Sequence, residues 1–276
     1  MENLLTFDGL SLEYQKYGCG KKIMIAFHGF GRSYHDFKIF ERLWGDEYTL
    51  YAFNNFHHGN SFYPKERIEQ NTLTKEELFA LFRHFLNEIG AERFSILGYS
   101  MGGKIGLTLI EGLADRIDKV FLFAPDGFSV AWWYKFASRT KLGNWLYRFT
   151  LNNPGWFFGL TNIAFKLKFI GQKLHKFVFM HIDTREKRQL VYDVWMTYRY
   201  ILPDLKLVKQ QVSDHDIKMW LFFGKYDKII KPEFGQRFIS KAANPDIKLE
   251  VMPIGHNMLT NKTIDFLMTK KEYDAL

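Results

Sequence analysis

A serine flanked by glycines, lying between a predicted strand and a predicted helix, constrains the fold of this chain more than any other feature. The segment reads Gly98-Tyr99-Ser100-Met101-Gly102-Gly103 and fits the pattern Gly-x-Ser-x-Gly. An apolar run at residues 94–97 precedes it, and apolar residues at helical spacing follow it over 101–113. A strand that reverses into a helix this quickly strains the middle residue, and the glycines remove side chains that would collide. The Ser100 hydroxyl is therefore predicted to project from a sheet edge, near the positive end of the helix.

Strand-like and helix-like segments alternate along most of the chain. The predicted strands are residues 4–7, 10–17, 23–27, 48–53, 94–97, 120–124, 219–223 and 247–252. The predicted helices are residues 33–44, 74–89, 101–113, 232–243 and 261–269. This alternation is typical of a mainly parallel sheet with helices on both faces. The clearest helix begins at Thr74, because Thr74 and Glu77 form a capping-box pattern.

The alternation breaks down between Asp126 and Ser213. These residues include 14 Lys/Arg and 5 Asp/Glu, a charge of +9, which leaves −1 for the rest of a chain whose net charge is +8. No Asp or Glu occurs from Gly127 to Ile182, and residues 126–213 hold 19 of the 49 aromatic residues. Long insertions of this kind often cover an active site. We therefore expect a core domain of residues 1–125 and 214–276, with a mainly helical cap at 126–213.

With this serine turn, the chain resembles the α/β-hydrolase family over nearly its whole length. The resemblance implies an eight-stranded, mainly parallel α/β sheet with helices on both faces and a helical cap insertion. The segment His28-Gly29-Phe30-Gly31 is similar to the family's turn after the third strand. The residue after His-Gly in that turn supplies a backbone N–H to an oxyanion hole. The matching donors here are the N–H groups of Phe30 and Met101, and the His28 side chain is expected to brace the turn.

The resemblance also indicates a general base and an acid, in the chain order nucleophile, acid, histidine. His256 lies just after the last predicted strand, where the family carries its catalytic histidine. The segment Gly224-Lys225-Tyr226-Asp227 is similar to the Gly-x-x-Asp at the family's acid position. Asp126 is the alternative acid, because some branches of the family carry the acid after the strand that ends here at Ala124. If Asp227 is the acid, we expect Asp126 to line the pocket or to cap the first helix of the insertion.

The loop at residues 54–61 matches its family counterpart, Asp-x-Arg-Gly-x-Gly-x-Ser, only in part. Asn54 stands where aspartate is usual and His57 replaces a glycine, so the loop is predicted to be held differently. The adjacent His57 and His58 suggest a metal site, but no further ligand follows at metal-binding spacing, so we expect no metal. Acyl transfer through a serine, histidine and aspartate needs no cofactor either.

The expected activity is hydrolysis of a carboxylic ester or thioester by two-step acyl transfer from Ser100, with His256 as base and Asp227 as orienting acid. A carbon–carbon bond hydrolase and a cofactor-free perhydrolase remain alternatives, because fold and triad do not choose among them. A non-catalytic hydrolase-like binding protein is the alternative from another class. Dehalogenase chemistry is disfavoured, because that branch of the family carries aspartate at the position of Ser100.

The aromatic and basic residues of the insertion allow several interpretations. The aromatic side chains could line an apolar acyl pocket or pack the cap. We take His28, Tyr99, Asp126, Trp132 and Trp133 as candidate substrate-binding residues. The lysines could bind an anionic leaving group, contact a membrane surface or solvate an outer face. Nucleic-acid binding is not expected, because no recognition motif accompanies the charge.

Two features bear on the compartment. The single cysteine, Cys19, excludes a disulfide within the chain and fits a reducing environment. The first eight residues have neither a basic region nor a long apolar run, so they do not read as a secretory signal. We expect a cytoplasmic protein, and the sequence leaves the oligomeric state open.

Overall fold

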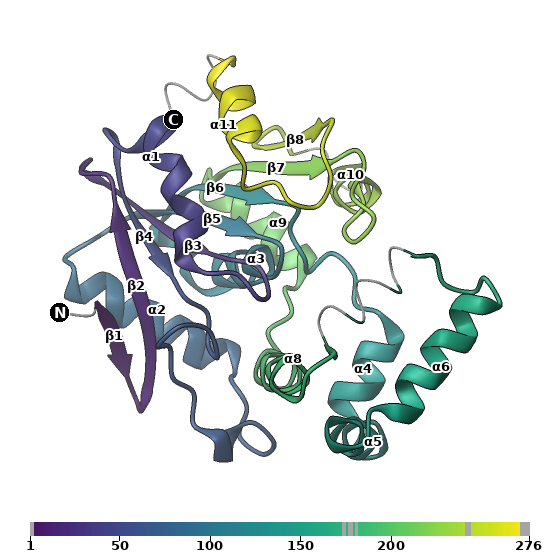
Figure 1. The fold of residues 1–276 in the computed structure, drawn as a ribbon. Coiled ribbons are helices and arrows are strands. Elements are labelled where there is room, and N and C mark those ends of the chain that lie inside the picture. The colour runs from purple at the N-terminus through teal and green to yellow at the C-terminus, as the bar shows by residue number, and fades with distance from the viewer. Residues whose placement is uncertain (1–2, 173–174, 176–178, 180–181, 241–243, 271–276) are drawn as a thin grey trace. The chain divides into compact units, whose positions relative to one another are not determined.

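The computed structural model describes residues 3–172, 175, 179, 182–240 and 244–270. The chain divides into two compact units. The first comprises Met1–Pro64, Leu73–Ser129 and Ile201–Leu276, and the second comprises Lys65–Thr72 and Val130–Tyr200. Each unit is described by itself below, with the element labels of Figure 1.

An eight-stranded, mostly parallel sheet forms the centre of the first unit, as the sequence predicts. Its strands in chain order are β1 (Leu4–Phe7), β2 (Leu10–Tyr17), β3 (Lys22–Phe27), β4 (Tyr48–Phe53), β5 (Phe94–Tyr99), β6 (Ile117–Phe123), β7 (Lys218–Gly224) and β8 (Ile247–Met252). Their order in the sheet is β1-β2-β4-β3-β5-β6-β7-β8. Strand β2 pairs antiparallel with both β1 and β4, and the remaining neighbours are parallel. The carboxyl ends of β3 to β8 therefore meet at one edge of the sheet.

The hairpin of β1 and β2 turns at Asp8 and Gly9. Both residues have positive φ, 48° for Asp8 and 74° for Gly9. Two consecutive residues in this region are the requirement of a type I′ turn, and Asp-Gly is among the sequences that meet it most readily. The dipeptide therefore accounts for the antiparallel start of an otherwise parallel sheet.

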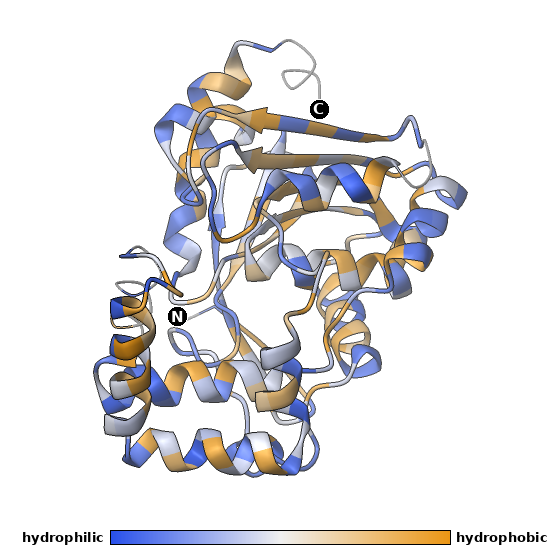
Figure 2. Cartoon of the chain, turned by 90° about the vertical axis from the view of Figure 1, so that its right-hand side faces the viewer, coloured by the Kyte–Doolittle hydropathy of each residue, from blue (hydrophilic) through white to orange (hydrophobic). Residues whose placement is uncertain are grey.

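Helices in the first unit pack on both faces of the sheet (Figure 1). They are α1 (Glu41–Trp44), α2 (Lys75–Glu88), α3 (Met101–Leu113), α9 (Leu205–Asp214), α10 (Pro232–Ser240) and α11 (Asn261–Met268). Polar and apolar residues alternate along the helices in Figure 2, as expected of elements with one buried face. The predicted capping box is present at the start of α2, where the Thr74 side chain accepts from the Glu77 N–H and the Glu77 side chain accepts from the Thr74 N–H.

The core on each face is rich in aromatic rings. On one face the ring centroids of Trp44 and Phe121 are 4.6 Å apart. Phe121 in turn stacks on Trp220, with ring centroids 4.9 Å apart. On the other face Phe82 of α2 meets Phe27 of β3 edge to face at 5.0 Å. Strands buried on both faces are consistent with the nearly continuous apolar runs in the sequence.

The predicted helix at residues 33–44 differs from the structure. Its first part is a 3₁₀ helix, Tyr34–Phe40, and only the short α1 follows. Residue Ser33 makes no side-chain capping bond, while Phe37, Phe40 and Trp44 are all buried. Phe37 and Phe40 are three residues apart and share a face in either type of helix, so their spacing alone cannot separate the two.

The second unit is helical. Its helices are α4 (Trp132–Arg139), α5 (Lys141–Asn152), α6 (Gly155–Lys166) and α8 (Arg185–Thr197). The segment 65–72, which lies between β4 and α2 in the chain, belongs to this unit as well. The Arg199 guanidinium donates to the carbonyls of Ile68 and Glu69 at 2.6 and 3.0 Å, and Thr72 donates to the Met196 carbonyl at 2.7 Å. None of the helices in the described ranges combines the length and the apolar character that a membrane crossing requires.

Candidate active site

The turn between β5 and α3 holds Ser100 in strained backbone geometry. Ser100 has φ 51° and ψ −116°, a region that residues with a side chain rarely adopt. Its N–H donates to the Phe123 carbonyl at 3.0 Å, which ties the turn to β6. A Cβ on Gly98 would lie 2.8 Å from Leu122, and one on Gly102 would overlap the Phe27 carbonyl. The two glycines are therefore steric requirements of the turn, as the sequence pattern predicts.

His256 follows β8 and meets Ser100 across the edge of the sheet. Its Nε2 atom lies 3.1 Å from the Ser100 Oγ. The Tyr99 hydroxyl donates to the His256 carbonyl at 3.1 Å, which fixes the backbone at this position. Burial raises the pKa of Tyr99 to about 12, so this hydroxyl keeps its proton at neutral pH.

Asp227, after β7, contacts the other nitrogen of the same ring. The His256 Nδ1 lies 2.7 Å from the Asp227 Oδ2, and the Asp227 side chain is buried. The second carboxylate oxygen accepts from the N–H groups of Ile229 and Ile230 at 2.8 and 3.0 Å. The tautomer with the proton on Nδ1 can donate to this carboxylate, and in that tautomer Nε2 can accept from the serine hydroxyl.

Asp126, the alternative acid, lies beside the serine turn in a different relationship. Its N–H donates to the Ser100 carbonyl at 2.9 Å. Its carboxylate accepts from the N–H of the next residue, Gly127, at 2.8 Å. Of the two candidate acids, the structure brings Asp227 to the ring of His256, while Asp126 supports the turn through its backbone.

The turn after β3 lies against the serine. A Cβ on Gly29 would lie 3.1 Å from the Ser100 Cβ, so the backbone of this turn passes directly beside the candidate nucleophile. Phe30 is the next residue, and Met101 is the first residue of α3, whose initial N–H groups have no partner within the helix. Both backbone N–H groups predicted to bind an oxyanion therefore belong to segments that adjoin Ser100.

The buried His28 side chain contacts this turn and the loop after β4, and its assignment as a substrate-binding residue stays a prediction. Its Nδ1 donates to the Gly29 carbonyl at 2.6 Å, and its Nε2 accepts from the Asn55 N–H at 3.0 Å. Burial, together with the nearby His58 ring, lowers the pKa of His28 to about 3. A neutral ring is what these contacts need, because a charged imidazole could not accept from Asn55.

His58 is a functional candidate that the sequence argument missed. Its Nε2 accepts from the Gly31 N–H at 3.0 Å, and its Nδ1 donates to the Phe56 carbonyl at 3.1 Å. The ring thus links the loop after β4 to the turn that contains Phe30. Burial lowers the pKa of His58, which keeps Nε2 available as an acceptor. The only indication in the sequence that His58 has a special role was its position next to His57. Across the described residues, no group of three or more His, Cys, Asp or Glu side chains is arranged to hold a metal ion.

A buried glutamate explains how the loop at residues 54–61 is held. Glu13 of β2 accepts from the Asn54 side chain at 2.7 Å and from the Asn60 N–H at 2.9 Å. The Asn54 Oδ1 in turn accepts from the Tyr34 N–H at 2.9 Å. Asparagine at position 54 can donate to Glu13 while it accepts from Tyr34, which an ionised aspartate could not do. His57 has φ 69°, which is consistent with a glycine at the corresponding position of the family's loop.

Trp132 and Trp133 lie on α4 of the second unit. Trp132 is exposed, and the Trp133 ring lies 5.4 Å from that of Trp195. Their assignment as substrate contacts, and the role of residues 126–213 as a cap, stay predictions.

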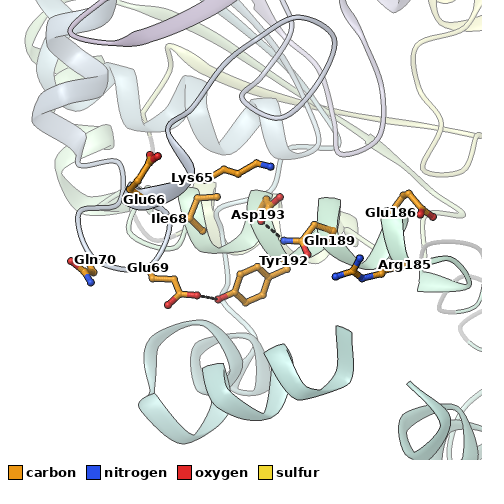
Figure 3. A pocket seen from close by; sticks show the side chains of 10 residues that line it. All are labelled: Lys65, Glu66, Ile68, Glu69, Gln70, Arg185, Glu186, Gln189, Tyr192 and Asp193. Carbon is orange, nitrogen blue, oxygen red and sulfur yellow. Dashed lines mark hydrogen bonds between the residues drawn. The ribbon is translucent and has the colours of Figure 1, made fainter. Parts of the chain in front are cut away.

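A pocket of about 600 Å³ lies within the second unit (Figure 3). It is lined by side chains from the segment 65–70 and from α8, among them Glu69, Tyr192 and Asp193. The Tyr192 hydroxyl donates to Glu69 at 3.2 Å, and the Asp193 carboxylate accepts from Gln189 at 2.8 Å. None of the residues predicted for the site lines this pocket, and it holds no serine, threonine or cysteine nucleophile.

Comparison with known proteins supports the family suggested by the serine turn. The model of the serine aminopeptidase S33 family matches residues 18–263. A dihydrolipoyllysine-residue acetyltransferase component of the acetoin cleaving system of Cupriavidus necator is 29% identical over 45% of this chain and 32% of its own. A Mycoplasma pneumoniae protein named esterase/lipase 2 is 30% identical over 37% of each chain. The chain thus spans about a third of the length of these curated relatives.

Solved structures agree with the fold. The enol-lactonase of Burkholderia xenovorans superposes with a TM-score of 0.65 and covers 99% of this chain and 100% of its own, at 16% identity. At 16% identity this similarity establishes a shared fold and nothing more. Because the family model covers most of the sequence, the chain belongs to the serine aminopeptidase S33 family of α/β-hydrolases.

Proposed function

We propose that this chain is a serine hydrolase that cleaves a carboxylic ester or thioester by two-step acyl transfer. The observation that carries the proposal is the continuous contact from the Ser100 Oγ through both nitrogens of His256 to Asp227, at 3.1 and 2.7 Å. A serine hydroxyl is a weak nucleophile until an adjacent base removes its proton, and the base needs a partner that fixes its tautomer. The three side chains supply these parts in that order.

In the first step Ser100 attacks the carbonyl carbon while His256 Nε2 takes the hydroxyl proton. Negative charge then develops on the carbonyl oxygen, and the N–H groups of Phe30 and Met101 are proposed to stabilise it. One such donor is typically worth about 10² to 10³ in rate. His256 next gives its proton to the leaving alcohol or thiol, which leaves an acyl group on Ser100. In the second step His256 deprotonates a water, and hydrolysis of the acyl-enzyme restores the serine.

Two candidate substrate classes follow from the comparisons. The names of the Mycoplasma pneumoniae relative and of the Burkholderia xenovorans structure favour esters and lactones. The description of the matching family favours a second candidate, an aminopeptidase, which would cleave a peptide amide with the same three side chains. We place esters first because an alkoxide leaving group needs less assistance from the protonated base than an amine does.

A fluorophosphonate probe tests the nucleophile directly, because it phosphonylates only a serine that a base activates. The wild type and a Ser213→Ala control, which changes an exposed serine elsewhere in the first unit, should be labelled equally. Ser100→Ala should not be labelled. Wild-type protein that is folded by circular dichroism and still resists the probe would overturn the proposal.

The substrate class requires a separate screen. Neutral esters of graded acyl length, matching thioesters and aminoacyl anilides should be compared at equal concentration. We expect ester or thioester turnover that disappears in Ser100→Ala. Turnover of the anilides alone would replace the first candidate by the second. Labelling without turnover in any of the three series would exclude both candidates and point to another reaction of an activated serine, such as cleavage of a carbon–carbon bond.

A further inference from the structure

The second unit presents a continuous apolar stripe along α6. Trp156, Leu160, Ile163 and Leu167 follow one another at intervals of four, three and four residues, so they share one side of the helix. Their exposed fractions are 36, 56, 53 and 60%. Phe169, two residues further, is 80% exposed.

Helix α5 carries a second stripe of the same kind. Leu142, Trp145 and Phe149 lie three and four residues apart and are all exposed. The rings of Trp145 and Phe149 stack with centroids 5.9 Å apart, so the side chains form one apolar surface. Each helix therefore exposes several large apolar side chains along one side.

Exposed apolar surface on this scale needs a partner. Single apolar residues on a surface are ordinary, but continuous patches mark contacts with a protein or a membrane. Seven of the twelve residues of α6 are apolar or aromatic, and such a helix is stable when something covers it.

The charge of the same segment indicates which partner fits. Residues 127–182 contain eight Lys or Arg and no Asp or Glu. Lys166 and Lys168 are exposed on either side of Leu167 in the chain, next to the α6 stripe. The acidic residues of the second unit lie instead in the segment 65–72 and from Asp183 onward. A surface that joins exposed Trp, Phe and Leu to lysines of a segment whose sequence contains no Asp or Glu is complementary to an anionic lipid headgroup layer.

We propose that the apolar stripes of α5 and α6, with Lys166 and Lys168, dock this protein on an anionic phospholipid membrane surface. The helices would lie in the plane of the interface with Leu160 and Ile163 in the headgroup and acyl boundary. The twelve residues of α6 span about 18 Å, less than the ~30 Å hydrocarbon core, so the helix cannot cross it. The proposal is independent of the proposed hydrolase activity.

Vesicle binding tests the proposal on the full chain. The wild type should co-sediment with vesicles of phosphatidylcholine and phosphatidylglycerol at low salt, and weakly with phosphatidylcholine alone. Tryptophan emission should shift to the blue on binding, because five of the seven tryptophans lie in residues 126–213. The double variant Lys166→Gln/Lys168→Gln should lower the partition coefficient about thirtyfold on the anionic vesicles, roughly fivefold for each lysine. Its matched control, Lys21→Gln/Lys262→Gln, removes two exposed lysines of the first unit and should bind like the wild type.

A second variant tests the apolar part. Leu160→Ser/Ile163→Ser should bind at least about tenfold more weakly, because two large side chains no longer enter the interface. Its control is Phe62→Ser, which removes an exposed ring from the first unit. The proposal is overturned if the wild type ignores anionic vesicles at low salt, or if both double variants bind as it does. It is also overturned if Leu160→Ser/Ile163→Ser converts a lipid-free dimer into a monomer, since a second copy would then cover the stripe. If Leu160→Ser/Ile163→Ser misfolds, the variant Lys166→Gln/Lys168→Gln still tests the proposal.

Discussion

The His256 Nδ1 lies 2.7 Å from the Asp227 Oδ2, and the other oxygen of that carboxylate accepts two backbone N–H groups. Asp227 therefore cannot rotate away without the loss of three hydrogen bonds. In the proposed mechanism this contact holds the His256 ring in the tautomer that directs Nε2 at Ser100. The sequence positions alone do not fix this arrangement, so the proposed roles of the two residues rest on the contact.

Replacement of the acid distinguishes the two candidates. Asp227→Asn should lower kcat for an ester by about 10⁴, because the amide favours the wrong tautomer of His256. Asp126→Asn should change kcat by less than about tenfold, since its contact with the Ser100 carbonyl is through the backbone and asparagine still accepts from Gly127. Initial rates with a saturating ester measure both. The opposite ranking would assign the acid to Asp126.

The contact between His58 and Gly31 predicts that His58 positions the neighbouring Phe30 N–H. His58→Leu removes the acceptor of the Gly31 N–H and should lower kcat about tenfold to a hundredfold, a fraction of the effect of a lost oxyanion donor. His58→Gln retains a side-chain acceptor and should recover part of the rate. A trifluoromethyl ketone, which forms an oxyanion on Ser100, should lose affinity by the same factor as kcat.

The substrate affinity separates this positioning role from a loss of structure. KM should stay within about twofold in His58→Leu, because the ground-state carbonyl depends less on the oxyanion donors than the intermediate does. If KM and kcat change together and His58→Gln gives no recovery, His58 only stabilises the loop.

Local patterns predict the regular elements well. Strand β8 occupies the predicted residues 247–252, and α3 the predicted residues 101–113, since a short apolar run or a 3.6-residue period is a property of neighbouring positions. The three candidate side chains were predicted from motifs similar to those of the family, and the structure brings these side chains into contact at the edge where parallel strands end. Within residues 33–44 the three-residue spacing of Phe37 and Phe40 also fits a 3₁₀ helix, and the prediction of a continuous helix was wrong.

Contacts between distant segments were not predictable in this way. Nothing near Glu13 marks it as buried, and its partner Asn60 lies 47 positions later. Asn54 stands where the family usually has aspartate, which predicted that the loop is held differently. It did not identify Glu13 as the partner of Asn54. Residues 65–72 join the second unit through the buried Arg199, some 130 positions away, and a local pattern carries no signal of that pairing.

The pairing of Asn54 with Glu13 can be tested by restoring the aspartate usual in the family. Asn54→Asp should lower the free energy of unfolding by about 2 kcal/mol or more at neutral pH, because a donated hydrogen bond becomes a contact between two carboxylates. Adding Glu13→Gln should recover at least about half of that loss, since the new amide can donate to the carboxylate introduced at position 54. Urea unfolding of the two single variants and the double variant measures the coupling. Asn152→Asp, an exposed control, should stay within about 0.5 kcal/mol, and additive effects at positions 13 and 54 would contradict the prediction.

The lowered pKa of His57, a residue whose backbone lies in the left-handed region, predicts a defined pH dependence of stability. Burial, with a smaller effect of the adjacent His58, lowers the pKa of His57 from 6.5 to about 4. Between these values the unfolded chain binds a proton that the folded chain does not, so the stability present above pH 6.5 is lost as the pH falls toward 4. His57→Gly removes this group and accepts φ 69° without strain. Across this window the free energy of unfolding of the wild type should therefore fall more steeply than that of the variant, by up to about 1.4 kcal/mol per pH unit. Urea unfolding at several pH values gives both curves. Parallel curves would show that the His57 ring is protonated equally in the folded and unfolded chains.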